Sequence, residues 1–91
     1  MNSHITDKFR KTFAELPADV QKQARQAYLL FIENPYHPSL RFKAIHPSRP
    51  IYSVRIGMDY RAVDIRDEDD IIWYWIGSHA KYDKLIREFR K

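Results

Sequence analysis

The sequence contains no cysteine, which excludes structural disulfides and metal sites built on thiolates. It has only two glycines, so we expect short loops rather than flexible linkers. Apolar runs such as residues 71–77 are far shorter than the ~20 residues of a membrane span. The first residues lack a basic segment followed by an apolar one, so no signal peptide is predicted. We therefore expect a cytoplasmic protein with no membrane association.

The 91 residues leave room for a single domain, residues 1–91, with one modest core. Hydrophobic residues make up 44% and charged residues 31%, which predicts a folded chain with a solvated surface. The formal net charge of +4 favours a polyanionic or acidic partner. Small basic proteins are common, so the charge alone does not identify that partner.

The first half of the sequence has the apolar spacing of two amphipathic helices. Leu16-Pro17 ends the first helix and opens the second, since proline is tolerated in a first turn. Asn34-Pro35 ends the second, because a residue before proline is pushed out of the helical region. We expect a helical hairpin whose shared apolar face includes Ile5, Phe9, Phe13, Leu16, Val20, Ala24, Ala27, Tyr28 and Phe31.

The second half changes to the alternating pattern of strands. Strands are predicted over residues 40–44, 52–56, 60–65 and 71–76, with turns at 57–59 and 67–70. The last strand is apolar on both faces, so we expect helices to cover it or neighbours to flank it. A short C-terminal helix begins near His79 and is capped by Ser78. The expected fold is α+β: the helical hairpin packed on an antiparallel sheet of about four strands, with a possible extra strand within residues 2–5.

The junction between the last strand and the last helix is the best candidate for a functional site. His79 and Tyr82 are three residues apart and therefore share one face of the helix. A helix N-terminus offers free N–H groups and a partial positive charge to an anion such as phosphate. With arginines on the neighbouring strands, these groups are those that RNA cleavage requires.

Several short motifs, taken in order, resemble the RelE/ParE toxin superfamily over nearly the whole chain. These are Leu16-Pro17, Asn34-Pro35, Tyr52-Ser53-Val54-Arg55-Ile56, Tyr60-Arg61-Ala62-Val63 and His79-Ala80-Lys81-Tyr82. The resemblance implies a small RelE-like toxin held inactive by a cognate antitoxin. RelE-like members cleave messenger RNA in the ribosomal A site, whereas ParE-like members share the fold but inhibit DNA gyrase.

The resemblance also implies roles for individual residues. It maps the family's strand arginines onto Arg61 and Arg55, its aromatic onto Tyr82, and the histidine of several branches onto His79. Two features depart from RelE. Ile51 and Ser53 stand where RelE has lysines, and Lys81 is the closest basic group to the position of a further arginine.

The chemistry assigns a role to each of these residues. His79 would be the general acid or base, because a histidine side chain ordinarily titrates near pH 6.5 (pKa ~6.5). Arg61 and Arg55 would bind the phosphate, since guanidinium groups pair with its oxygens. Tyr82 would stack on a base or orient the scissile group. An electrostatic track for the RNA backbone would include Arg41, Lys43 and Lys81.

Structural explanations remain open for the same residues. His79 could simply begin a helix, and Tyr82 could be a core aromatic. Arg61 could form a salt bridge with Asp59 or Asp83, and the basic residues could be an ordinary solvated surface.

The leading hypothesis is therefore a toxin that acts as a ribosome-dependent mRNA endoribonuclease. The four histidines lack metal-ligand spacing, so we expect no metal, and no cofactor is predicted. The alternatives are a non-enzymatic, ParE-like inhibitor of DNA gyrase and an inactive member that keeps the fold and binds a partner. The strand carrying Trp73 and Trp75 is the predicted surface for an acidic antitoxin peptide.

Overall fold

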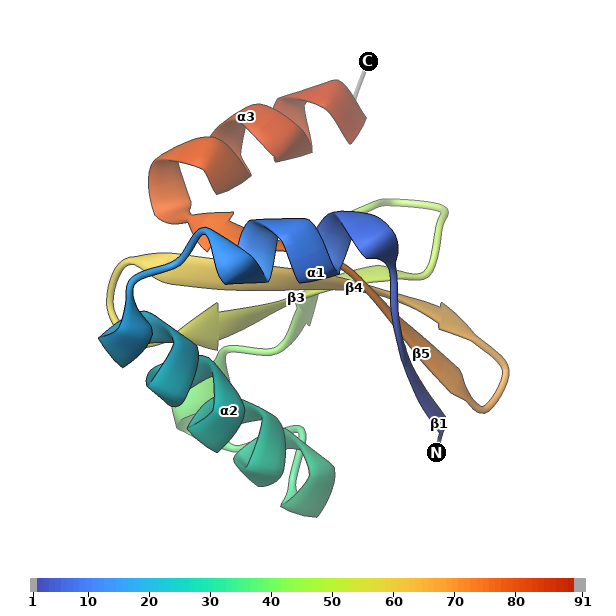
Figure 1. The fold of residues 1–91 in the computed structure, drawn as a ribbon. Helices are drawn as coiled ribbons and strands as arrows, with labels where there is room; N and C mark the ends of the chain where they lie inside the picture. Colours follow the sequence, from blue (N-terminus) through green and yellow to red (C-terminus); the bar gives the residue numbers. More distant parts are fainter. Residues whose placement is uncertain (1, 90–91) are drawn as a thin grey trace.

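The computed structural model describes residues 2–89, which form three α-helices and a five-stranded mixed sheet (Figure 1). The elements follow the order β1 Asn2–Ile5, α1 Asp7–Ala14, α2 Ala18–Glu33, a 3-10 turn η1 Pro38–Leu40, β2 Lys43–Ala44, β3 Ile51–Ile56, β4 Tyr60–Asp67, β5 Asp70–Ser78 and α3 His79–Phe89. The strand order is β1-β5-β4-β3-β2, and β1 alone runs parallel to its neighbour. The predicted α+β class is confirmed, with β1 as the possible extra strand and five strands instead of about four.

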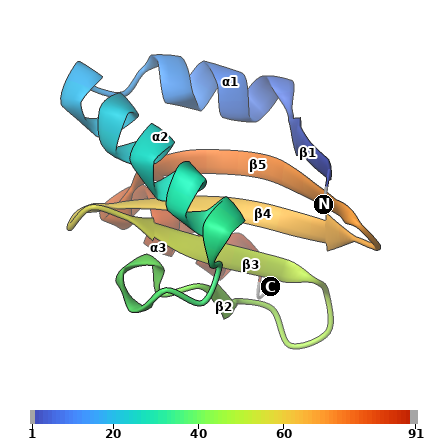
Figure 2. The ribbon, with the colours of Figure 1, turned by 90° about the horizontal axis from the view of Figure 1, so that it is seen from below.

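Helices cover both faces of the sheet. Helix α2 lies on one face of the sheet and α3 on the other, while α1 runs along the β5 edge (Figures 1 and 2). Two separate hydrophobic cores result. The core under α1 and α2 includes Phe31, Val54 and Ile71, and the core under α3 includes Val63 and Leu85.

An irregularity in β5 divides the two tryptophans between these cores. In the β4–β5 ladder Val63 pairs with Trp75 but Asp64 pairs with Trp73, so Tyr74 is an extra residue on β5. Side chains alternate along a regular strand, so Trp73 and Trp75 would otherwise face the same side. The bulge instead places Trp73 in the α2 core and Trp75 in the α3 core.

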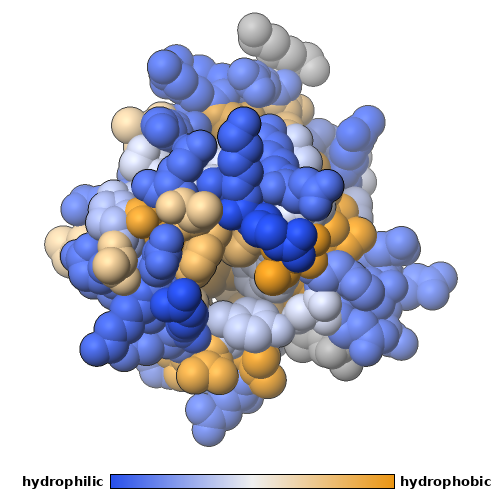
Figure 3. Space-filling view, viewed as in Figure 1, coloured by the Kyte–Doolittle hydropathy of each residue, from blue (hydrophilic) through white to orange (hydrophobic). Residues whose placement is uncertain are grey.

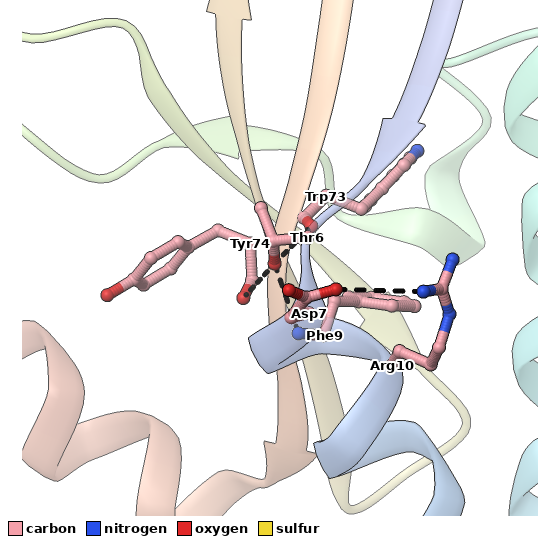
Figure 4. Close-up of polar contacts among 6 residues, drawn as sticks. All are labelled: Thr6, Asp7, Phe9, Arg10, Trp73 and Tyr74. Atoms are coloured by element: carbon pink, nitrogen blue, oxygen red, sulfur yellow. Dashed lines mark hydrogen bonds and ion pairs between the residues drawn. The ribbon is translucent and has the colours of Figure 1, made fainter.

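Thr6 joins β1, α1 and the bulged part of β5 (Figure 4). Its hydroxyl accepts a hydrogen bond from the backbone N–H of Phe9 at 3.1 Å and thereby caps α1. The same hydroxyl lies 3.1 Å and 3.2 Å from the carbonyl oxygens of Trp73 and Tyr74, to which it donates. An exposed Asp7–Arg10 ion pair of 3.6 Å follows in the first turn of α1. The start of α1 is thus fixed against β5.

Two local predictions are wrong. Ile5 belongs to β1 and is exposed, because the chain enters the helix only after the Thr6 cap. The strand predicted over residues 40–44 reduces to Lys43–Ala44. Pro38 opens a 3-10 turn instead, and Arg41 ends that turn in the left-handed region with φ 45°. None of the helices in the described part of the chain is both long and apolar enough to span a bilayer.

Candidate functional site

The first turn of α3 is anchored to the turn between β3 and β4, residues 57–59. The N–H of His79 donates to the carbonyl of Asp59 at 2.7 Å. The N–H of Lys81 donates to the Ser78 hydroxyl at 3.3 Å, which confirms the predicted cap. Gly57, with φ +60°, supplies the left-handed residue that this turn needs. The helix N-terminus therefore has a fixed position above the end of the sheet.

Arg55 and Arg61 face each other across the β3–β4 ladder. Both are partly buried, on the side of the sheet that α3 covers. Arg55 Nε donates to the Gly57 carbonyl at 2.7 Å, so this guanidinium rests on its own turn. Arg61 Nη1 is buried and has no hydrogen-bond partner among residues 2–89. Within residues 2–89 neither arginine forms an ion pair, so the salt bridge proposed for Arg61 with Asp59 or Asp83 is wrong.

Tyr82 lies close to both the arginine and the histidine. Its ring centroid is 5.7 Å from Cζ of Arg61 and 5.8 Å from the ring centroid of His79, which it meets edge-on. Only 3% of Tyr82 is exposed, so no face of the ring is free to stack on a base. The predicted stacking role is therefore wrong for this conformation. The residue is both a core aromatic and the group that holds Arg61 and His79 in place.

His79 is the accessible member of the group. Its side chain is 49% exposed, and Nδ1 lies 3.3 Å from Oδ2 of Asp83, one helical turn further on. Sequence reasoning missed this pairing because it treated Asp83 only as a possible partner of Arg61. The spacing of four residues on one helix was the available signal.

The predicted basic track is only partly assembled. Lys43 pairs with Ser53, two residues before Arg55 on β3, so it lies on the same face of the sheet. Lys81 is exposed in the first turn of α3. Arg41 does not project from a strand, because it ends the 3-10 turn in a left-handed conformation. The prediction for Arg41 is therefore wrong in its structural premise.

This arrangement can bind an anion beside a group that transfers protons. Two arginines are opposite each other in the β3–β4 ladder, one buried guanidinium nitrogen has no acceptor in the described part of the chain, and a helix N-terminus lies nearby. Like charges directly opposite each other destabilise a sheet, and an anion bound between them would remove that cost. His79 at the same helix terminus could give a proton to the anion or take one from it.

A second surface feature lies on the opposite face of the sheet. A groove of about 630 Å³ runs between α1 and α2, and its lining is mainly apolar. Figure 3 shows apolar side chains around a recess on this side of the molecule. Arg10 and Arg25 line the groove together with the exposed Leu29. Trp73, on the strand predicted as a partner surface, lines this groove, whereas Trp75 lies in the core under α3, so the prediction is wrong for Trp75.

Comparison with solved structures finds the same fold in toxins of toxin–antitoxin systems. The RelB–RelE antitoxin–toxin complex from Methanococcus jannaschii matches with a TM-score of 0.73 and 17% identity, over 90% of this chain and 96% of that chain. YafQ from Escherichia coli BL21(DE3) matches with a TM-score of 0.69 and 13% identity, over 89% and 96% of the two chains. The intact Escherichia coli RelBE toxin–antitoxin complex matches with a TM-score of 0.64 and 14% identity, over 85% and 94%.

Two sequence comparisons complement the structural one. The search of curated proteins finds no significant match. The family model of the ParE-like toxin domain matches residues 18–84, from the start of α2 into α3. This segment includes both arginines, His79 and Tyr82. The chain therefore belongs to the ParE-like toxin domain family and has the fold of the RelE toxins.

Proposed function

We propose that this protein is the toxin of a toxin–antitoxin pair and that it cleaves messenger RNA on the ribosome. The observation that carries the proposal is the Arg55–Arg61 pair, which lies on the side of the sheet that α3 covers and forms no ion pair within residues 2–89. A polyanion that supplies a phosphate to this pair would bind next to a proton-transfer group.

The proposed reaction is attack of a 2′-hydroxyl on the adjacent phosphorus. His79 acts as general base on the 2′-hydroxyl or as general acid on the departing 5′-oxygen. Arg61 and Arg55 neutralise the charge that develops on the phosphorane oxygens. Tyr82 packs against both the Arg61 guanidinium and the His79 ring and orients them. The products are a 2′,3′-cyclic phosphate and a 5′-hydroxyl end.

The proposed partner is an antitoxin with an acidic amphipathic segment that binds the groove between α1 and α2. The structural relatives include toxins in complex with antitoxins of the RelB type. In this chain the groove offers apolar side chains with Arg10 and Arg25 among its lining residues. An acidic helix with one apolar face complements such a surface.

The test is cleavage of messenger RNA by the purified protein with ribosomes, read from the ends of the fragments. His79→Ala should lower the rate by about 10²–10⁴-fold, as expected for loss of a proton-transfer group. His4→Ala is a matched control. His4 also lies 3.3 Å from an aspartate, Asp70, but at the opposite end of β5. Intact message with the wild-type protein, or equal activity of the two variants, would refute the proposal.

The alternative is non-enzymatic inhibition of DNA gyrase, which the ParE-like family assignment favours. Here toxicity would survive the double change His79→Ala and Arg61→Ala and would appear as DNA damage. Inducible expression, with translation and DNA supercoiling followed in parallel, separates the two functions. Absence of growth arrest in both assays would indicate an inactive member.

A further inference from the structure

The Asp83 side chain contacts the ring of His79 and has no part in the reaction proposed above. Its Oδ2 lies 3.3 Å from Nδ1 of the histidine. Both residues belong to α3 and are four positions apart, so the helix backbone itself brings the two side chains together.

His79 is held by one backbone contact and two ring contacts. Its backbone N–H donates to the Asp59 carbonyl at 2.7 Å, its ring meets Tyr82 edge-on at 5.8 Å, and its Nδ1 faces Asp83. Within residues 2–89 only Nδ1 of the two ring nitrogens has a protein partner. Nε2 is therefore the nitrogen available to a ligand.

We propose that Asp83 is a positioning residue that holds His79 in the Nδ1–H tautomer, with the Nε2 lone pair directed toward the phosphate site. This inference rests on the proposed function. The contact has the distance of an ion pair. A carboxylate oxygen offers only lone pairs, so its approach to Nδ1 favours the form in which Nδ1 carries the proton. The Nε2 lone pair is then free to take a proton, and the same carboxylate stabilises the imidazolium that results.

The environment of the pair makes its effect separable from folding. The two side chains are 49% and 51% exposed, and exposed ion pairs contribute little to stability. The other charged or titratable groups of the site are Arg55, Lys81, Tyr82 and Arg61, which lies over the Tyr82 ring. All of them remain when Asp83 is replaced, so the tautomer and orientation of His79 are what the replacement alters.

The experiment combines RNA cleavage with NMR of ¹⁵N-labelled histidine in the full chain. Asp83→Ala should lower kcat by about tenfold with little change in KM, less than the loss expected for His79→Ala. The ring nitrogen shifts of His79 should report loss of the Nδ1–H tautomer. In the His79→Ala background, Asp83→Ala should cause no further loss of rate.

Asp70→Ala is the matched control, because it removes the carboxylate beside His4 and leaves α3 unchanged. It should alter neither the rate nor the nitrogen shifts of His79. An active wild type with an unaffected Asp83→Ala variant, in rate or in tautomer, overturns this inference alone. A wild type that does not cleave RNA overturns the proposed function first, and this inference with it.

Discussion

Arg66 Nε lies 3.5 Å from Oδ1 of Asp64, and the aspartate side chain is completely buried on the face of the sheet that α2 covers. The Arg66 guanidinium lies over three aromatic rings, with Cζ 5.0 Å from Phe42, 5.4 Å from Tyr52 and 5.7 Å from Phe31. Burial raises the pKa of Asp64 from 3.8 to about 7, against the opposing charge of Arg66. The charged form of this carboxyl is therefore unfavourable in the folded protein.

This raised pKa predicts a stability that falls as pH increases. The stabilisation that protonated Asp64 adds to the free energy of unfolding is fully present below about pH 4. It is lost as pH rises through the folded pKa of about 7. Asp64→Asn should remove this dependence and make the protein more stable at pH 8, by up to about 4 kcal/mol. Urea unfolding at a series of pH values measures the free energy of unfolding of the wild type and of Asp64→Asn.

Asp67→Asn is the control for that experiment, since Asp67 lies on the same strand but is exposed. It should leave the dependence of the unfolding free energy on pH as in the wild type. A wild-type protein whose stability rises between pH 5 and 8 would show that Arg66 compensates the burial of Asp64.

The pair of opposed arginines predicts a conflict between stability and function at Arg61. Arg61→Met keeps an apolar stem over Tyr82, removes the buried Nη1 that has no partner among residues 2–89, and removes the like charge opposite Arg55 in the ladder. We expect unchanged stability, or a gain of about 0.5–1 kcal/mol, together with a large loss of RNA cleavage. Thermal unfolding and the cleavage assay measure the two effects.

Arg87→Met is the control, because it removes the same charge from the exposed side of α3. It should change neither the thermal stability nor the rate of RNA cleavage. A marked destabilisation by Arg61→Met would instead mean that this arginine is mainly a structural residue.

Local sequence patterns were enough to predict most of the elements and the grouping of the site. The Leu16-Pro17 break, the Ser78 cap and the alternation of Arg61 with Val63 depend only on neighbouring residues. Arg55 and Arg61 share a face because a tight turn at Gly57 fixes the register between two consecutive strands. The cluster followed from these short-range constraints.

The features that the sequence did not predict depend on contacts between distant segments or on single backbone angles. The pairing of β1 with β5 joins residues about seventy positions apart. The extra residue Tyr74 is visible only in the pairing with β4, and the left-handed Arg41 only in the backbone. Asp64 is buried beneath helix α2 beside Arg66. The alternation of polar and apolar residues along its strand does not predict that burial.

Gly77 is predicted to be required for the position of Trp75. A Cβ added at Gly77 would lie 2.5 Å from Cζ2 and 2.8 Å from Cη2 of the Trp75 ring, which is buried and rigid. Gly77→Ala should therefore destabilise the protein by about 1–3 kcal/mol, as overpacking does, and shift tryptophan fluorescence. Trp75→Phe provides a smaller ring, so the double variant should lose less than the sum of the two single variants. Additive losses would mean that the strand moves aside instead.

The groove between α1 and α2 predicts a specific effect on antitoxin binding. Leu29 lines the groove and is 66% exposed, whereas Ile32, one turn further along α2, is 54% exposed and does not line it. Leu29→Glu should weaken the complex with the cognate antitoxin by about 10- to 100-fold, because it places a charge in an apolar contact facing an acidic segment. Ile32→Glu introduces the same charge at another exposed site, outside the groove, so affinity should stay within about twofold of wild type. Since both side chains are exposed, neither change should lower the melting temperature of the free toxin appreciably. Titration of the antitoxin measures the affinities, and equal weakening by both variants would place the antitoxin elsewhere on the molecule.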